Sequence, residues 1–538
     1  AWGWVYGLAL LPLVLGCAVL AWRWGRGPVA AVASDEPVEP VVEVTRLQQL
    51  RWVGLSFVPS SLLLGVTTAL ATDIASLPLL WVVPLTLYLV TWILAFAGRP
   101  LLATTIIARI FAIALVAWLM LYLGEATEPA GALIGLHLLT FFLAAWMCHA
   151  RLADDRPHTR SLTGFYLCLS LGGVLGGMFN ALLAPLIFDD LSEYPLAMAA
   201  AALAMPALVA GRSLLPSRRD LAVAAAVGIA CALANLTLPL PPGPLHMILV
   251  IGLPALVVYA GVRRPQRFAL GVIAILLAAQ LHPGIHGAPI YRTRSFFAAH
   301  RVTQSQSGQL HRILHGNTLH GRQWVDPERR CEPLAYYHRT GPVGDVVGAL
   351  ASTDRLMQAG VVGLGAGAMA SYAGPRQRWT FYEIDPAVAA IATNPELFSY
   401  LSDCATGRIE VVLGDARLRL REAPAGRYDL LTIDAFSSDS IPVHLLTREA
   451  FVVYLARLAP GGLLTFHISN RYLDLVPQLA AQARAAGLVW RLRDDRRLAG
   501  PLPGVEPSRW LVMARQESFL GPLLFDRRWH RSEVEATA

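Results

Sequence analysis

The sequence contains no lysine, and all 44 of its basic residues are arginine. Chemistry that needs an ε-amino group is therefore excluded: Schiff-base enzymes, pyridoxal phosphate enzymes and Walker-type nucleotide loops. Charge of either sign is also scarce, since 15% of the residues are charged and 55% are hydrophobic. Because the mean hydropathy of +0.50 is far above that of a soluble protein, a large part of the chain is predicted to lie in a membrane.

Cysteine is scarce as well. The six cysteines are scattered and none forms a CxxC pair, so the sequence predicts neither a zinc site nor a disulfide framework. Cys331 and Cys404 belong to the polar second half of the chain. A bond between those two would indicate an oxidising compartment.

Long apolar runs dominate residues 1–287, which we predict to be a transmembrane domain of about ten helices. The first run has no basic start and no small-residue cleavage site, so it is not a cleavable signal peptide. The chain also opens inside an apolar run, as a fragment of a longer protein would. The ten runs cover residues 3–22, 52–71, 77–97, 104–123, 129–148, 162–187, 194–211, 220–239, 244–262 and 267–283.

Arginines gather in alternate loops between these runs. They follow runs one, three, five, seven and nine, while the intervening loops carry acids or no charge. The positive-inside rule makes the arginine loops cytoplasmic, which predicts a multi-pass protein of the plasma (inner) membrane. Because arginines also follow the short tenth run, we take the polar half as cytoplasmic. If that run crosses the bilayer, the loop charges place the polar half outside instead.

Paired glycines mark the sixth run. Gly172-Gly173 and Gly176-Gly177 form two overlaid small-xxx-small pairs, a pattern that lets two helix backbones approach closely. We predict that they serve helix packing.

The polar half reads as two parts. Residues 296–325 contain three short alternating runs separated by turn residues, which predicts a small antiparallel β subdomain over residues 288–340. Residues 341–538 alternate strand-like and helix-like segments, which predicts an α/β Rossmann-like domain with a mostly parallel sheet. Its strands are expected at 359–364, 379–384, 409–413, 428–434, 462–468 and 510–514.

Glycines and acids follow the first four of these strands. Gly363, Gly365 and Gly367 allow a tight turn and a close backbone approach, with free N–H groups expected on a following helix. Glu383 ends the second strand, where a carboxylate can accept both ribose hydroxyls. Asp415 ends the third strand and suits an adenine amino group. Since the ends of parallel strands share one edge of a sheet, the pattern predicts a nucleoside site.

The order of motifs resembles the spermidine synthase family of polyamine aminopropyltransferases, specifically its membrane-fused members. The resemblance covers about residues 296–515. The matching segments are Tyr336-Tyr-His338, the glycine loop from Gly363 to Gly367, Glu383-Ile-Asp385, Gly414-Asp415, Tyr428-Asp429 to Asp434, and Pro460-Gly-Gly462.

The resemblance implies a class I methyltransferase/spermidine synthase-like fold and a sulfonium donor, decarboxylated S-adenosylmethionine. Asp434, with Tyr337, would orient an attacking amine and accept its proton, and methylthioadenosine would leave. Acceptor contacts are expected from Asp439, His338 and Gln323. No metal is expected.

Two departures from the family pattern affect this interpretation. Ala366 stands where the family has the aspartate that receives the donor's amino end, and two extra residues separate Asp434 from Asp439. These departures leave two explanations. Either the donor is S-adenosylmethionine itself in place of decarboxylated S-adenosylmethionine, or the donor is the decarboxylated form and the acceptor is unusual. The segment from His467 to Tyr472 either lines an altered acceptor site or forms a plain loop.

The leading hypothesis is a membrane-bound aminopropyltransferase-like enzyme acting on an amine or polyamine. One alternative is an S-adenosylmethionine-dependent methyltransferase with a membrane substrate, and a second is a transporter whose polar domain senses a nucleoside or polyamine. The expected partners are a small amine and the lipid bilayer, with a homodimer left open. Nucleic acid is not expected, because most arginines are explained by loop topology.

Overall fold

The computed structural model describes residues 44–74, 79–208, 215–238, 243–281, 284–436, 441–470, 473–495 and 504–531. The chain divides into two compact units, residues 1–46 and residues 47–538. The first predicted apolar run and Asp439 lie outside the described residues.

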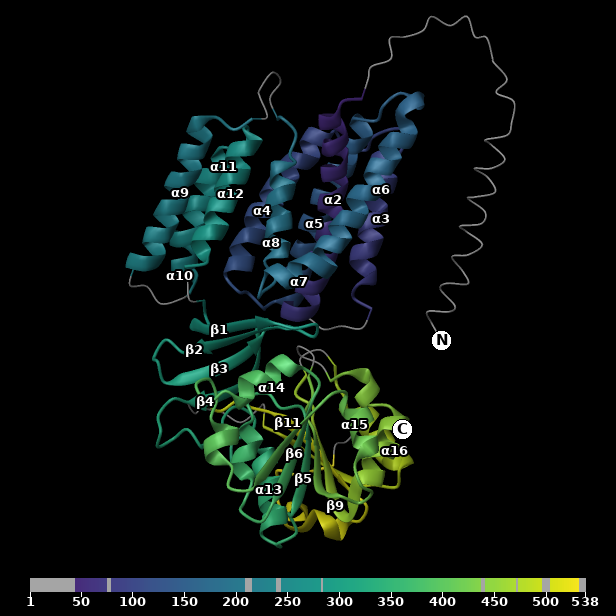
Figure 1. Cartoon of the computed structure of the whole chain (residues 1–538), viewed down its shortest axis with the longest axis vertical. Coiled ribbons are helices and arrows are strands. Elements are labelled where there is room, and N and C mark those ends of the chain that lie inside the picture. The colour runs from purple at the N-terminus through teal and green to yellow at the C-terminus, as the bar shows by residue number, and fades with distance from the viewer. Residues whose placement is uncertain are drawn as a thin grey trace, which may run out of the picture. The chain divides into compact units, whose positions relative to one another are not determined.

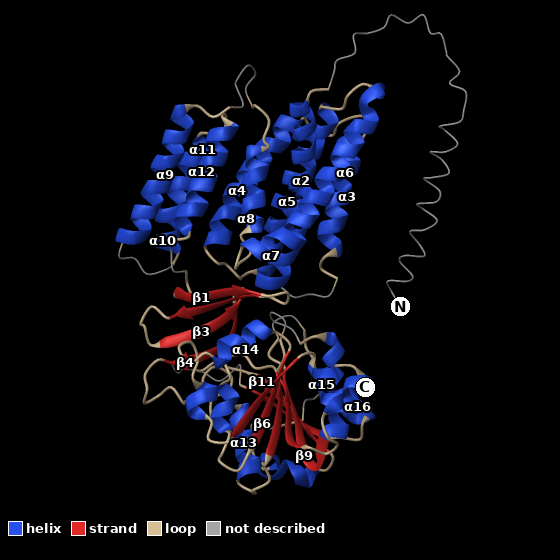
Figure 2. Ribbon diagram, viewed as in Figure 1, coloured by secondary structure: helices blue, strands red, loops and turns tan. Residues whose placement is uncertain are grey.

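Helices account for most of the described residues between 44 and 281 (Figures 1 and 2). Each of the nine described apolar runs coincides with a helix or a broken helix. The helices are α2 (Arg46–Ala69), α3 (Val82–Phe96), α4 (Thr104–Leu123), α5 (Ala130–Asp154), α6 (Leu162–Met178), α7 (Ala184–Ile187), α8 (Glu193–Leu203), α9 (Arg218–Thr237), α10 (Pro244–Met247), α11 (Leu253–Ala260) and α12 (Pro265–Ala279). Single π-helical turns (Leu70–Ile74, Phe179–Leu183 and Ile248–Gly252) extend α2, join α6 to α7 and join α10 to α11.

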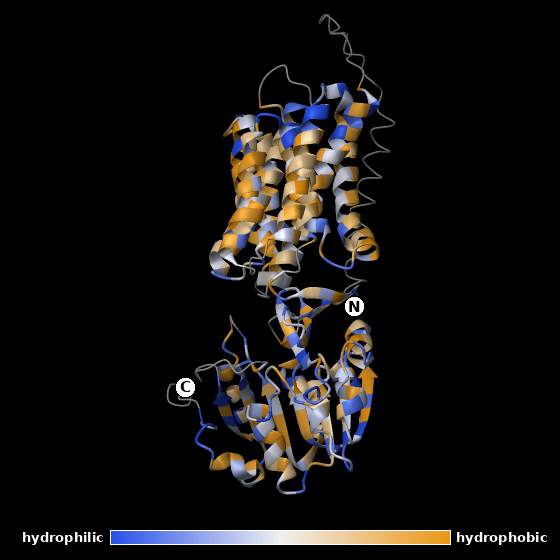
Figure 3. Ribbon diagram, turned by 90° about the vertical axis from the view of Figure 1, so that its left-hand side faces the viewer, coloured by the Kyte–Doolittle hydropathy of each residue, from blue (hydrophilic) through white to orange (hydrophobic). Residues whose placement is uncertain are grey.

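Five of the described helical segments are long and apolar enough to cross a membrane by length and composition. They are Arg46–Thr72, Thr104–Leu123, Ala130–Asp154, Thr159–Ile187 and Arg218–Thr237. The other described runs form shorter helices. The helices are apolar on their outer faces too (Figure 3), where Leu167, Leu186 and Ile229 are 68%, 83% and 60% exposed. Side chains of this kind are expected to face an apolar environment rather than water.

Gly172 and Gly176 of α6 lie against α2, in agreement with the predicted role of the paired glycines in helix packing. A Cβ atom at Gly172 would lie 2.3 Å from the backbone oxygen of Val53, and one at Gly176 would lie 2.4 Å from that of Phe57. The backbones approach so closely that Ser56 Oγ donates a hydrogen bond to the Leu169 carbonyl of α6. Small residues therefore set this helix contact.

The chain then forms a four-stranded antiparallel sheet, called the β subdomain below. Its strands, in spatial order, are β1 (Ala288–Arg294), β2 (Ala299–Gln304), β3 (Leu310–His315) and β4 (Thr318–Trp324). The sequence predicted three runs and missed β1, because that edge strand is exposed along most of its length and lacks an alternating apolar signal.

A seven-stranded sheet forms the centre of the α/β domain (Figure 2), in the order β10-β11-β9-β8-β5-β6-β7. β7, β6, β5, β8 and β9 are mutually parallel, and β11 and β10 complete the sheet in antiparallel pairing. This is the strand order of the Rossmann-like class I methyltransferase fold that was predicted. The strands are β5 (Gln358–Val362), β6 (Arg378–Glu383), β7 (Arg408–Leu413), β8 (Tyr428–Ile433), β9 (Leu458–His467), β10 (Val489–Asp494) and β11 (Arg509–Ala514).

The sequence did not predict β10, because Arg491 and Arg493 interrupt its apolar run. Arg493 is 2% exposed, and its guanidinium is paired with Asp345 and Asp495. A buried arginine with two carboxylate partners is compatible with a strand that composition alone disfavours.

Helices cover both faces of the seven-stranded sheet. One face packs against α13 (Pro342–Ala351), α14 (Pro386–Thr393) and the 3₁₀ helix Ala368–Tyr372. The other packs against α15 (Ala416–Glu422), α16 (Arg448–Arg457) and α17 (Val476–Ala485). β5 lies between β6 and β8, so the order of the strands reverses at its carboxyl end. In open α/β sheets, ligands bind at this point.

Gly363 follows β5 and fixes this junction. Its φ of +99° disfavours any other residue, and a Cβ atom there would lie 2.3 Å from the backbone oxygen of Asp434. We predict that Gly363→Ala lowers the free energy of unfolding by at least about 2 kcal/mol, through strain plus steric clash. Thermal unfolding of the purified protein measures the loss.

Gly348→Ala is the matched control, because Gly348 lies in α13 and the position that a Cβ atom would take there has no neighbouring atom within 4 Å. That change should leave the unfolding midpoint unchanged or slightly raised. Equal midpoints for the two variants would contradict the close contact at Gly363.

Candidate functional site

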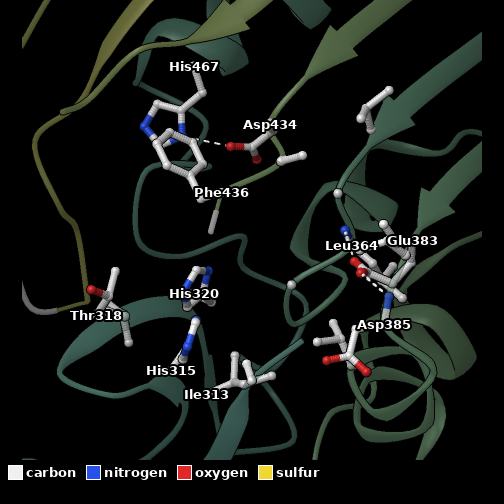
Figure 4. Close-up of a pocket in the computed structure, with 18 of the residues that line it drawn as sticks. Ile313, His315, Thr318, His320, Leu364, Glu383, Asp385, Asp434, Phe436 and His467 are labelled. Atoms are coloured by element: carbon white, nitrogen blue, oxygen red, sulfur yellow. Dashed lines mark hydrogen bonds and ion pairs between the residues drawn. The ribbon is translucent and has the colours of Figure 1, made fainter. Parts of the chain in front are cut away.

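A cavity of about 780 Å³ opens at the carboxyl ends of β5, β6, β8 and β9, and the β subdomain closes one side of it (Figure 4). Of the predicted nucleoside residues, Gly363, Gly365, Glu383 and Asp415 line it, as does Asp434, whereas Gly367 does not. A cavity of this size is in the range of small-molecule sites.

The glycine loop and Glu383 form one wall. Gly363, Gly365 and Gly367 all have positive φ, as a tight turn requires. The Glu383 carboxylate accepts hydrogen bonds from the backbone N–H groups of Leu364, at 3.0 Å, and Asp385, at 2.9 Å. Burial raises the pKa of Glu383, and these hydrogen bonds oppose the rise. The carboxylate is thus fixed in orientation beside the loop.

The segment that follows the glycine loop does not form the predicted α-helix. A 3₁₀ helix, Ala368–Tyr372, follows Gly367 instead. The expectation of free N–H groups on an α-helix was therefore wrong, and the backbone N–H groups next to the cavity belong to the loop itself.

Asp385 belongs to the same wall and is held by the β subdomain. Its Oδ2 accepts hydrogen bonds from His300 Nε2, at 2.7 Å, and from Ser295 Oγ, at 2.6 Å. Burial alone would raise the pKa of Asp385, but these hydrogen bonds outweigh it and the pKa lies below its ordinary value. Asp385 therefore links the nucleoside wall to β2.

Asp415 lies at the end of β7 and caps α15. Its Oδ1 accepts a hydrogen bond from the Leu418 N–H at 3.0 Å, and its Oδ2 lies 3.4 Å from His444 Nε2. Asp415 and His444 both line the cavity.

Asp434 ends β8, 8% exposed, and its carboxylate has two side-chain partners. The Tyr337 hydroxyl donates to Oδ2 at 2.5 Å, and His467 Nδ1 lies 2.7 Å from Oδ1. Burial, reinforced by Asp434, raises the pKa of Tyr337 well above its ordinary value, so the phenol stays protonated and donates. The structure thus brings together Asp434 and Tyr337, as the predicted catalytic pair requires.

The sequence had left the role of His467 open. Ser469 Oγ accepts the Arg509 N–H at 2.8 Å and lies 2.8 Å from His467 Nε2. We infer that the serine proton points to Nε2, which leaves the imidazole proton on Nδ1, facing Asp434. His467, Ser469 and Asn470 line the cavity, so the start of this segment is part of the site. Residues 471–472 lie outside the described residues.

Two predicted acceptor contacts lie elsewhere. Gln323 is buried, and its amide bonds the Arg330 carbonyl, Ser399 Oγ and the Ser399 N–H. His338 bonds Thr340, and burial lowers its pKa. Neither side chain lines the cavity, so both placements argue against substrate contact. The third predicted contact, Asp439, lies outside the described residues and stays a prediction.

The sequence missed a group of histidines on the β subdomain. His300, His315 and His320 come from β2, β3 and β4, and all line the cavity. His300 and His315 are directly opposed in the sheet, with ring centroids 5.6 Å apart, and those of His315 and His320 are 5.9 Å apart. Burial lowers the pKa of His315 to about 4 and that of His320 to about 3. The available signal was a histidine in or beside each predicted run of the β subdomain.

Cys331 and Cys404 form a disulfide, with their Cα atoms 5.1 Å apart. The sequence did not predict this bond, although it named the pair as one whose bonding would be informative. A sequence separation of 73 residues gives no signal of proximity until the fold places both segments side by side.

Searches for similar proteins match part of the chain. No family model matches. A polyamine aminopropyltransferase of Vibrio vulnificus is 33% identical over 120 residues, which are 21% of this chain and 38% of that protein. Polyamine aminopropyltransferase 2 of Streptomyces coelicolor is 34% identical over 161 residues, 28% of each chain. The chain thus spans well under half of the length of these relatives, and over that part it is homologous to polyamine aminopropyltransferases.

Solved structures were also matched. A probable spermidine synthase of Corynebacterium glutamicum is 18% identical, with a TM-score of 0.34, over 42% of this chain and 79% of that one. A spermidine synthase of Thermotoga maritima is 13% identical, with a TM-score of 0.32, over 45% and 79%.

The buried histidines predict a pH dependence of stability. The unfolded chain would protonate His315 and His320 near their ordinary pKa of 6.5, whereas the folded protein resists this down to about pH 4 and 3. The unfolded state therefore binds more protons in this window, and stability falls as pH falls below 6.5. Thermal unfolding midpoints between pH 7.5 and 4.5 measure the slope.

His315→Asn removes one such group and should flatten the slope in that window. His530→Asn, which alters an exposed histidine, should leave the slope unchanged. A wild-type slope retained in His315→Asn would contradict the role of that imidazole.

Proposed function

We propose that the protein is a membrane-bound aminopropyltransferase-like enzyme. It would transfer an aminopropyl-type group from a sulfonium nucleoside to an amine and release methylthioadenosine. The observation that carries this proposal is the Tyr337–Asp434–His467 cluster at the end of β8, in the same cavity as Glu383 and Asp415. The partial homology to polyamine aminopropyltransferases supports the same reaction class.

The nucleoside would occupy the wall formed by the glycine loop, Glu383 and Asp415. Each Glu383 oxygen uses one lone pair on a backbone N–H and keeps another that could accept a ribose hydroxyl. The glycine loop leaves room for the nucleoside because Gly363 and Gly365 have no side chain that would project into the cavity. The bound sulfonium supplies an electrophilic carbon and a neutral thioether leaving group.

Asp434 would orient the amine and accept its proton. Tyr337 and His467 hold one carboxylate oxygen each, so the carboxylate cannot rotate and its remaining lone pairs are available to the amine. Holding the nucleophile in line with the reacting carbon contributes to rate through orientation, and the base adds general-base catalysis. His467 is a positioning residue in this scheme, oriented by Ser469.

Asp434→Asn tests the assignment of the base. An amide cannot take the proton, so turnover should fall about 10²- to 10⁴-fold, measured as methylthioadenosine release. The affinity for methylthioadenosine should stay within about threefold, because the nucleoside wall is unchanged. Asp354→Asn, which alters an exposed ion pair with Arg376, should leave both quantities unchanged.

Equal loss of binding and turnover in Asp434→Asn would contradict the role of Asp434 as base. The identity of the nucleoside product separates the leading reaction from its first alternative. Release of S-adenosylhomocysteine in place of methylthioadenosine would convert the proposal to methyl transfer.

As a second candidate function, the helical part would bind the amine substrate or pass it to the α/β domain. A second cavity, of about 250 Å³, is lined by His137 of α5, Asn235 of α9, the loop residue Glu125 and residues of β1 and β2. It shares His300 and Asn317 with the first cavity. This contiguity favours a helical part that binds or passes an amine to the α/β domain.

For the side of the membrane, we propose the second of the two predicted alternatives, in which the α/β domain lies outside. The acidic loops that the positive-inside rule places outside contact the β subdomain through ion pairs: Arg301 with Glu125 at 3.0 Å, and Arg294 with Glu193 at 2.9 Å. The Cys331–Cys404 disulfide supports the same side, since such bonds persist in oxidising compartments.

Cysteine labelling in intact cells tests this arrangement. We expect Cys331 and Cys404 to react with a membrane-impermeant maleimide only after treatment with an impermeant reductant. Cys148, buried in α5, should stay unlabelled in the folded protein and serves as the internal control. Labelling of Cys331 without reductant, and only in permeabilised cells, would place the domain in the cytoplasm.

A further inference from the structure

The end of the cavity formed by β4 lies directly against the glycine loop. A Cβ atom at Gly365 would lie 2.5 Å from the backbone oxygen of His320. A Cβ atom at Gly321 would lie 2.6 Å from the Cβ atom of Ala366. Residue 366 is thus packed against β4, and a longer acidic side chain could not be accommodated at this position without moving the strand.

Basic and imidazole side chains occupy this end instead. Thr318, His320 and Arg322 of β4 all line the cavity. Thr318 and His320 are labelled in Figure 4. Among the described residues, His320 Nε2 and Arg322 Nε are buried without a hydrogen-bond partner. Arg322 has one ion-pair partner, Glu506. Both side chains therefore retain hydrogen-bonding capacity for a ligand.

The carboxylates that line the cavity are already engaged. Within the described part of the chain, Asp385 pairs with His300, Asp415 with His444, Asp434 with His467 and Glu506 with Arg322, while Glu383 accepts two backbone N–H groups. A donor tail that carries only an ammonium group would find no unpaired carboxylate at the β4 end. A tail that carries both an ammonium and a carboxylate would find donors for the carboxylate.

We propose that the β4 end of the cavity is a carboxylate subsite, in which His320 and Arg322 donate hydrogen bonds to the α-carboxylate of the sulfonium donor. The donor is then S-adenosylmethionine itself. This inference rests on the proposed function, in which the group next to sulfur is transferred and methylthioadenosine leaves. It names the group transferred as 3-amino-3-carboxypropyl.

The step balances without a further reactant. The lone pair of the acceptor nitrogen forms the new N–C bond, the S–C bond breaks, and its electron pair stays on sulfur, which becomes a neutral thioether. The proton released from the nitrogen passes to Asp434. The carboxylate takes no part in bond making, so its subsite affects binding and alignment.

Calorimetric titration of the full-length protein in detergent tests the subsite without relying on turnover. The probes are S-adenosylmethionine, decarboxylated S-adenosylmethionine, S-adenosylhomocysteine and methylthioadenosine. We expect the two carboxylate-bearing nucleosides to bind at least about tenfold more tightly than their counterparts without it. Arg322→Gln and His320→Phe should each remove much of this advantage and leave methylthioadenosine binding unchanged.

Arg312→Gln is the matched control. Arg312 of β3 lies directly opposite Arg322 of β4 in the sheet, but it does not line the cavity. The change therefore removes the same charge from the neighbouring strand. It should leave all four affinities unchanged. The retained affinity for methylthioadenosine in every variant reports that the nucleoside wall is still folded.

Three outcomes would count against the donor assignment. Equal binding of the two donors by the wild-type protein overturns it, as does a parallel loss of methylthioadenosine binding in Arg322→Gln and His320→Phe. If Arg322→Gln instead raises the KM for glycine or β-alanine as acceptor and spares S-adenosylmethionine, the carboxylate belongs to the acceptor. Carboxylate-dependent binding without methylthioadenosine release would refute the proposed function and leave the subsite standing.

Discussion

Two backbone contacts at the glycine loop organise the whole site. Gly363 meets the backbone of Asp434 on one side, and Gly365 meets the backbone of His320 on the other. Because neither glycine has a side chain, β5, β8 and β4 can converge on one loop. The nucleoside wall, the carboxylate of Asp434 and the histidines of the β subdomain thus become parts of one cavity.

The second constraint is electrostatic. Buried carboxylates need partners, and here each described one is held by an imidazole, a guanidinium, a phenol or backbone N–H groups. These contacts fix the orientation of the carboxylates and use part of their hydrogen-bonding capacity.

The helical part and the β subdomain are joined by charge pairs. Arg294 forms two hydrogen bonds with Glu193, and the pair is largely buried. Breaking a buried pair of this kind leaves an uncompensated charge and is costly. His300 extends the connection, since it lines both cavities and holds Asp385 in the nucleoside wall. The helices are thus connected to the site through a short series of contacts.

The sequence by itself determined what depends on local pattern. Apolar runs gave the helices, glycines gave the turn after β5, and acids after short apolar runs gave Glu383, Asp415 and Asp434, because strand ends of a parallel sheet must share an edge. Homologous motifs supplied Tyr337. Of the nine predicted runs that the structure describes, five have the length and composition of a membrane span, since apolar composition does not fix helix length.

Only the tertiary structure decided what depends on contacts between distant segments. It brought His300, His315 and His320 from three strands to one wall, joined Ser469 and His467 to Asp434, and paired Cys331 with Cys404. It also placed Gln323 and His338 away from the cavity. The physical reason is the same in each case: side-chain direction and long-range packing are set by sheet register and by close contact at glycines, and neither is encoded in a short stretch of sequence.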